Sequence, residues 1–224
     1  MARNVNPRKQ ILTYYFSVEG ETEKWYLDWL ESQINALDEA KFKVKIVSKV
    51  QKDPVSFIKK LVVQKKTVLW HLSDIEGSSE EQLRTVHNTL GRLKDAKELG
   101  KSIVYKWGYS NLSFDLWMVL HKQNCNAELS SVDGYLNHIN RAFSAHFESM
   151  KKYKEEANFK HCLNQLRLTD VISAIGRAKT IMQRNNRDGY HLTLHKGYAY
   201  YSHNPSLDLW QPIEIILADC GLLS

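Results

Sequence analysis

The alternation of two hydrophobic periodicities restricts the fold of this chain more than any other feature of its sequence. In its first half, four segments rich in β-branched and aromatic residues are each followed by a segment with apolar residues at helical spacing. The predicted strands are residues 11–18, 41–50, 67–73 and 102–109, and the predicted helices are about 21–37, 54–64, 78–99 and 110–122. Strands that alternate with helices in this way form mainly parallel sheets covered by helices. The sequence therefore predicts an α/β fold.

The second half has a different character, because its patterns from Val132 to Gln183 are helical. The segment 190–205 is too aromatic and too rich in turn residues for a helix, and it predicts a loop or a short hairpin. A last amphipathic helix is expected at about 207–217. We therefore predict one compact unit, in which a helical extension of residues 124–224 packs on an α/β core of residues 1–123.

Length and composition exclude several classes of protein. A chain of 224 residues can bury a sizeable core, and no run approaches the roughly 18 uncharged residues that span a bilayer. The start of the chain has no apolar segment behind its charges, so we expect a cytoplasmic protein without a membrane partner. Three widely spaced cysteines predict neither a disulfide framework nor a zinc site. The formal net charge of +6 weakly favours a nucleic-acid partner.

Three acidic residues follow two of the predicted strands. Glu19 comes directly after the first strand, and Asp74 and Glu76 come directly after the third. The carboxyl ends of parallel strands meet at one edge of a sheet, so Glu19 can meet Asp74 although they are far apart in sequence. Residues two apart in an extended chain point the same way, so Asp74 and Glu76 can share one cation. Three hard oxygen ligands suit Mg²⁺ or Mn²⁺, and such a site suits phosphate-ester chemistry.

These acids also have a simpler interpretation. Carboxylates at strand ends often cap helices, and acids in the first turn of a helix are stabilised by its dipole. Glu21 and Glu23 both fall in the first turn of a predicted helix. Glu21 best fits an acid that stabilises the helix start, whereas Glu23 fits either that role or a role in chemistry. Glu19 precedes the glycine and gains less from the dipole, so it is the preferred candidate for chemistry.

Several motifs, in this order, resemble those of a known protein family. They are EGETEKWY at 19–26, SDIE at 73–76 and SNLSFDLWMVLH at 110–121, with looser matches in YKE at 153–155 and NPSLDLWQPIEIIL at 204–217. The first two resemble the glutamate motif and the Asp-x-Asp motif of Toprim domains. The whole set resembles the RloB-like family, which consists of Toprim-related proteins of prokaryotic defence and abortive-infection loci. The resemblance covers most of the chain.

The resemblance implies a Toprim-like fold and a metal-dependent nuclease of antiviral defence. It implies that Glu19 is a metal ligand or acid–base group, that Asp74 is a metal ligand, and that Glu76 occupies the place of the second aspartate. Two further departures are Asp115, where the family has Glu, and Leu112, where it has Pro. These departures leave two alternatives open. The site is catalytic with altered geometry, or the chain is a degenerate module that binds nucleic acid or a partner ATPase.

The third motif follows the fourth strand, so its start is expected at the same edge of the sheet as Glu19 and Asp74. Asp115 is a candidate for an added carboxylate of the site, or for an acid at a helix start. His121 is a candidate for a catalytic or phosphate-contacting role, and the alternative is a buried structural histidine. The catalytic candidates are Glu19, Glu23, Asp74, Glu76, Asp115 and His121, and the candidate ligands of Mg²⁺ or Mn²⁺ are Glu19, Asp74 and Glu76.

Residues 150–161 and 190–203 interleave basic and aromatic residues, a mixture that binds phosphates and stacks unpaired bases. The same pattern is typical of a solvated helix face and of a packed hairpin. A phosphoacceptor receiver domain fits less well, because Gly20 follows Glu19 where a second acid is needed. Nothing in the sequence separates DNA from RNA or a nucleotide as substrate, and it predicts no oligomeric state.

Overall fold

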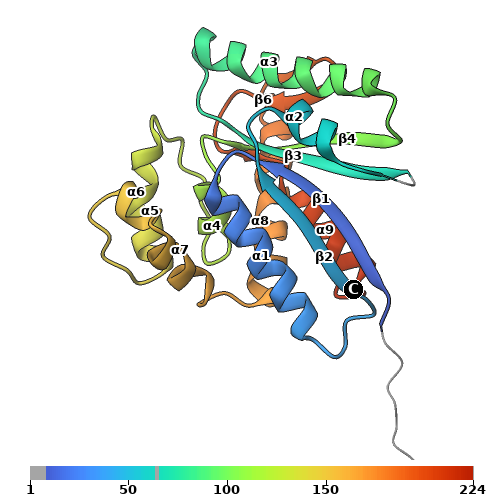
Figure 1. Cartoon of the computed structure of the whole chain (residues 1–224). Coiled ribbons are helices and arrows are strands. Elements are labelled where there is room, and N and C mark those ends of the chain that lie inside the picture. Colours follow the sequence, from blue (N-terminus) through green and yellow to red (C-terminus); the bar gives the residue numbers. More distant parts are fainter. Residues whose placement is uncertain (1–8, 64–65, 224) are drawn as a thin grey trace, which may run out of the picture.

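A five-stranded sheet lies at the centre of the molecule (Figure 1). The computed structural model describes residues 9–63 and 66–223. The strands, in their order across the sheet, are β2 (Lys43–Val50), β1 (Ile11–Val18), β3 (Thr67–Ile75), β4 (Ile103–Asn111) and β7 (Ser206–Leu207). Strands β1 to β4 run parallel, and the short β7 runs antiparallel to the end of β4. The predicted α/β fold with a mainly parallel sheet is confirmed.

Helices cover both faces of the sheet. Those of the first half are α1 (Glu21–Ala36), α2 (Pro54–Lys60), α3 (Glu80–Asp95) and α4 (Asp115–Leu120). Phe16 and Trp70 pack in one core cluster with α1 and with α9 (Trp210–Asp219). Leu69 and Tyr105 pack in a second cluster with α2 and α3 on the opposite face. The side chains of each central strand therefore alternate between two buried layers.

Two helix ends predicted in the first half, the start of α2 and the end of α3, are confirmed. The fourth helix is shorter than predicted, because Ser110 and Asn111 still pair in β4 and α4 covers only Asp115–Leu120. The Asp53 side chain accepts a hydrogen bond from the Val55 N–H and caps α2, whose first residue is Pro54. This helix ends at Lys60, earlier than predicted, and Gln64 lies outside the described residues. Helix α3 begins after Ser79 and continues as a 3-10 turn to Gly100, which has a φ of 65° and ends the helix as predicted.

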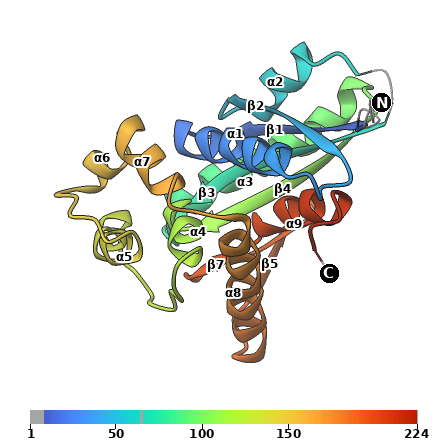
Figure 2. The same ribbon diagram turned by 90° about the horizontal axis from the view of Figure 1, so that it is seen from below.

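The second half consists mainly of short helices that lie beside the carboxyl ends of β1 and β3 (Figures 1 and 2). They are α5 (Tyr135–Ala142), α6 (Met150–Tyr153) and α7 (Glu156–Leu163), followed by the longer α8 (Leu168–Arg187). The predicted hairpin is confirmed as β5 (Leu192–His195) and β6 (Tyr198–Tyr201). These helices are therefore placed where loops from the sheet converge.

The last predicted helix starts three residues late. Ser206 and Leu207 form β7 and pair with Asn111 and Ser110 of β4, so their backbone groups are used in the sheet before α9 begins. The chain thus returns to the sheet, and the predicted core and extension share one hydrophobic cluster. Within the described residues, all three cysteines are free and buried, and no helix has the length and apolarity needed to cross a membrane.

Candidate active site at the carboxyl ends of the strands

The sheet brings Glu19 and Asp74 together. Strands β1 and β3 are parallel neighbours with Val18 opposite Leu72, so both carboxylates lie at the same edge of the sheet. The Asp74 N–H donates a hydrogen bond to Glu19 Oε2 at 3.1 Å, across 55 positions of sequence. The expected meeting of these two acids is therefore confirmed by direct contact.

Glu23 turns inward from the first turn of α1 and is only 4% exposed. Its Oε2 accepts a hydrogen bond from the Thr22 hydroxyl at 2.6 Å. A Cβ atom at position 20 would lie 3.0 Å from the same oxygen, so Gly20 leaves room for this carboxylate to fold back over the helix start. Glu21, by contrast, is exposed, as expected of an acid that serves the helix start. Glu23 was expected either to serve the helix start or to belong to the site, and its burial favours the site.

Asp115 begins α4 and is completely buried. Its Oδ2 accepts a hydrogen bond from the Ser113 hydroxyl at 2.7 Å and forms an ion pair with Lys154 Nζ at 2.8 Å. Its Oδ1 has no hydrogen-bond partner among the described residues. A buried carboxylate oxygen without a partner is costly, unless a bound cation or another donor satisfies it.

The electrostatics join these four carboxylates, which we call the acidic cluster (Glu19, Glu23, Asp74 and Asp115). Burial raises the pKa of Glu19 to about 7, although the Asp74 N–H and the charge of Lys52 act in the opposite direction. Burial also raises the pKa of Asp74, and the charges of Glu23, Glu19 and Asp115 raise it further. The pKa of Glu23 is raised by burial first and by Asp115 in addition. The four acids therefore repel one another in a site of limited solvent access.

Lys154 supplies positive charge to this cluster from the end of α6. Burial lowers its pKa, but the charges of Asp115, Asp74 and Glu23 outweigh burial and raise the pKa overall. The sequence indicated Lys154 only as part of a loose YKE match and of a basic segment, so its contact with Asp115 was missed. The residue before Lys154 is the aromatic Tyr153, which is buried. This neighbour distinguishes Lys154 from the exposed lysines of the same segment.

Glu76 lies outside the acidic cluster as the structure places it. It follows the end of β3, and its side chain is exposed. Its charge is the smallest of the named influences on the pKa of Glu19. In the described part of the chain, no three His, Cys, Asp or Glu side chains are arranged as a group that could hold a metal ion. The metal triad of Glu19, Asp74 and Glu76 thus stays a prediction. The charge of Asp115 raises the pKa of Asp74, whereas that of Glu76 raises the pKa of Glu19.

The donor chemistry of the acidic cluster nevertheless fits a hard divalent cation. Carboxylate oxygens are the ligands that Mg²⁺ and Mn²⁺ prefer, and Asp115 Oδ1 has no other partner among the described residues. A cation among these acids would offset their mutual repulsion.

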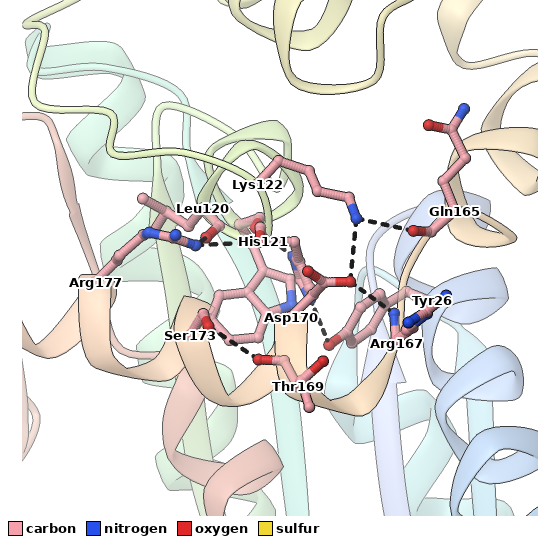
Figure 3. Close-up of polar contacts among 11 residues, drawn as sticks. Tyr26, Leu120, His121, Lys122, Gln165, Arg167, Thr169, Asp170, Ser173 and Arg177 are labelled. Carbon is pink, nitrogen blue, oxygen red and sulfur yellow. Dashed lines mark hydrogen bonds and ion pairs between the residues drawn. The ribbon is translucent and has the colours of Figure 1, made fainter.

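His121 lies in a buried hydrogen-bond chain (Figure 3). Its Nδ1 lies 2.8 Å from the Trp117 carbonyl, which can only accept, so Nδ1 carries the proton. Its Nε2 then accepts from the Tyr26 hydroxyl at 3.1 Å. Burial lowers the pKa of His121 to about 4, so the ring is neutral at pH 7. Because both ring nitrogens are used, this arrangement favours the structural alternative over the catalytic one.

Helix α8 fixes the other end of α4 (Figure 3). Arg177 Nη1 donates to the Leu120 carbonyl at 2.6 Å and to the His121 carbonyl at 3.1 Å. Lys122 Nζ contacts Asp170 Oδ2 at 3.1 Å and the Gln165 carbonyl at 2.8 Å. The helix that begins with Asp115 is therefore held at its C-terminal end by side chains of the second half of the chain.

Of the two basic and aromatic segments, 150–161 contacts the acidic cluster through Lys154. Lys152 and Lys160 are exposed and pair with Glu155 and Glu156 on the same surface. In the hairpin, His195 stacks on His87 of α3 with ring centroids 3.9 Å apart. Contact of either segment with nucleic acid remains a prediction.

Comparison with known proteins gives one match. A family model described as "RloB-like protein" matches residues 14–216, which includes every residue of the acidic cluster and Lys154. No curated protein and no solved structure matches the chain.

Proposed function

Because the chain belongs to the RloB-like protein family, we propose that its acidic cluster is the active site of a metal-dependent nuclease that cleaves phosphodiester bonds in DNA or RNA. The observation that carries this proposal is the convergence of Glu19, Glu23, Asp74 and Asp115 at the carboxyl edge of the sheet, with Asp115 Oδ1 unpartnered among the described residues. Ligand sites of open parallel sheets lie at this edge. A place in antiviral defence is supported by the family resemblance.

Mg²⁺ or Mn²⁺, when bound, would supply an activated water and neutralise charge on the departing oxygen. Glu19, Asp74 and Asp115 would provide its oxygen ligands once their carboxylates draw closer together than the structure places them. Ser113 and the Asp74 N–H orient two of these side chains. Burial raises the pKa of Glu19 to about 7, and a cation bound to its carboxylate would favour the ionised form. Burial raises the pKa of Glu23, so this side chain is suited to hold a proton beside these acids.

A degenerate module that binds nucleic acid or a partner ATPase is the second candidate. The observations that favour it are the exposure of Glu76 and the ion pair by which Lys154 already neutralises Asp115. This candidate predicts binding of nucleic acid without cleavage under any divalent metal.

The test is cleavage of plasmid, single-stranded DNA and total RNA by the purified protein with Mn²⁺ or Mg²⁺. We expect Asp74→Asn to reduce cleavage at least about 100-fold, since loss of a single group that stabilises charge in a transition state costs that much in other enzymes. Glu21→Gln, at an exposed acid of the same helix start, should leave cleavage unchanged. Activity that survives Asp74→Asn would exclude the acidic cluster, and absence of cleavage on every substrate would favour the binding module.

A further inference from the structure

Lys154 differs from the other lysines of its segment. Lys152 and Lys160 pair with acids three or four positions away on the surface, whereas Lys154 reaches Asp115 of another element. Its side chain is 36% exposed and that of Asp115 is 0% exposed, so the ion pair joins a partly exposed lysine to a buried carboxylate. The contact is therefore tertiary and is directed into the acidic cluster.

The backbone around Lys154 is anchored. The preceding residue, Tyr153, is completely buried, and its ring contacts those of Phe147 and Phe159 with centroids 5.6 Å and 5.5 Å apart. The four-carbon stem of a lysine is flexible by comparison and permits more than one position of the ammonium group. The anchor thus keeps Lys154 at the rim of the cluster while its charged end can change partner.

We propose that Lys154 is an internal counter-ion of the acidic cluster, and that a divalent cation that binds at the unpartnered Asp115 Oδ1 repels its ammonium group away from Oδ2. This inference rests on the proposed metal site. The displaced group remains at the rim of the acidic cluster, where a phosphate of the substrate would approach. Lys154 is accordingly a positioning residue that sets the metal affinity of the site and exchanges one anionic partner for another.

The physical reason is competition for one carboxylate. Asp115 Oδ2 already accepts from Ser113 and pairs with Lys154, so a cation that binds the unpartnered Oδ1 meets the ammonium charge at close range. Two positive charges a few ångströms apart repel strongly in a partly buried site. Lys154 therefore weakens metal binding, and it also prevents the four acids from destabilising the metal-free protein.

Two measurements on the full-length chain test this inference. In the first, free Mn²⁺ is quantified by electron paramagnetic resonance during titration of wild type, Lys154→Met, Lys154→Arg and the surface control Lys152→Met. We expect Lys154→Met to bind Mn²⁺ at least about tenfold more tightly, because one repelling charge is removed. Lys154→Arg and Lys152→Met should bind within about threefold of wild type, because neither removes a charge from the cluster.

The second measurement uses the wild-type protein, so it does not depend on whether Lys154→Met folds. Lysines are acetylated briefly with and without Mn²⁺, and the modified peptides are quantified by mass spectrometry. Acetylation of Lys154 should rise severalfold with Mn²⁺, while that of Lys152 should stay constant.

The outcomes separate this inference from the nuclease proposal. Unchanged or weaker Mn²⁺ binding by folded Lys154→Met, or Lys154 acetylation that does not respond to Mn²⁺, overturns the role of Lys154 and leaves cleavage by the wild type as evidence for a nuclease. Tighter binding and increased acetylation without cleavage of any substrate support the role of Lys154 and contradict the nuclease. Absence of Mn²⁺ binding by wild type and variants alike contradicts both.

Discussion

The Glu19 side chain contacts the neighbouring strand and also has a raised pKa. Its carboxylate accepts the Asp74 N–H, yet burial and the neighbouring acids raise its pKa from the usual 4.5 to about 7. A group with a raised pKa in the folded state binds its proton more tightly there than in the unfolded chain. The contribution of Glu19 to the stability of the protein therefore falls as the pH rises from about 4.5 to about 7.

This dependence of stability on pH gives a prediction for Glu19→Gln. The variant cannot ionise but keeps an acceptor for the Asp74 N–H, so it should match wild type at pH 4.5 and be more stable at pH 7.5. The expected gain is on the order of 1 to 3 kcal/mol from the size of the pKa shift. Urea denaturation of metal-free protein at both pH values measures it. The control Glu21→Gln should change stability by less than about 0.5 kcal/mol at either pH. A difference between Glu19→Gln and wild type that does not grow with pH would contradict the raised pKa.

At the scale of the elements, α4 links the site to the second half of the chain. Asp115 stands at its start, and Arg177 of α8 donates to the carbonyls of Leu120 and His121 at its end. We expect Arg177→Met to lower the free energy of unfolding by about 1 to 3 kcal/mol, because two carbonyl groups lose a charged donor.

Urea denaturation measures this loss, and Arg187→Met on the same helix is the control. Arg187 is exposed and pairs with its neighbour Asp188 at the surface, so its loss should cost less than about 0.5 kcal/mol. Equal effects of the two substitutions would show that α8 does not hold α4 through Arg177.

The elements of the sheet could be predicted from periodicity, because their patterns are local. The alternation in residues 11–111 and the caps at Asp53 and Gly100 each depend on neighbouring residues. Strand β7 could not be predicted, because its two residues become a strand only by pairing with β4. Of the site, the meeting of Glu19 and Asp74 followed from sheet topology. The burial of Glu23, the exposure of Glu76 and the reach of Lys154 depend on tertiary packing, which spacing in the sequence does not encode.

At the scale of the whole molecule, one edge of the sheet collects acids from three separate parts of the chain. β1 and α1 supply Glu19 and Glu23, β3 supplies Asp74, and α4 supplies Asp115. Helices α5 to α7 lie beside this edge and bring Lys154 to it (Figures 1 and 2). The second half of the chain thus completes the electrostatics of a site whose acids all come from the first half.

The central claim is that this acidic cluster binds the metal ion of the reaction. Anomalous diffraction at the manganese edge, from crystals soaked in Mn²⁺, tests it most directly. The account predicts one strong peak about 2.0 to 2.2 Å from carboxylate oxygens of Glu19 and Asp74, with Asp115 as a further ligand and with the peak lost in Asp74→Asn. A peak bound by Glu76 without Asp74, or no peak at this edge of the sheet, would contradict the account.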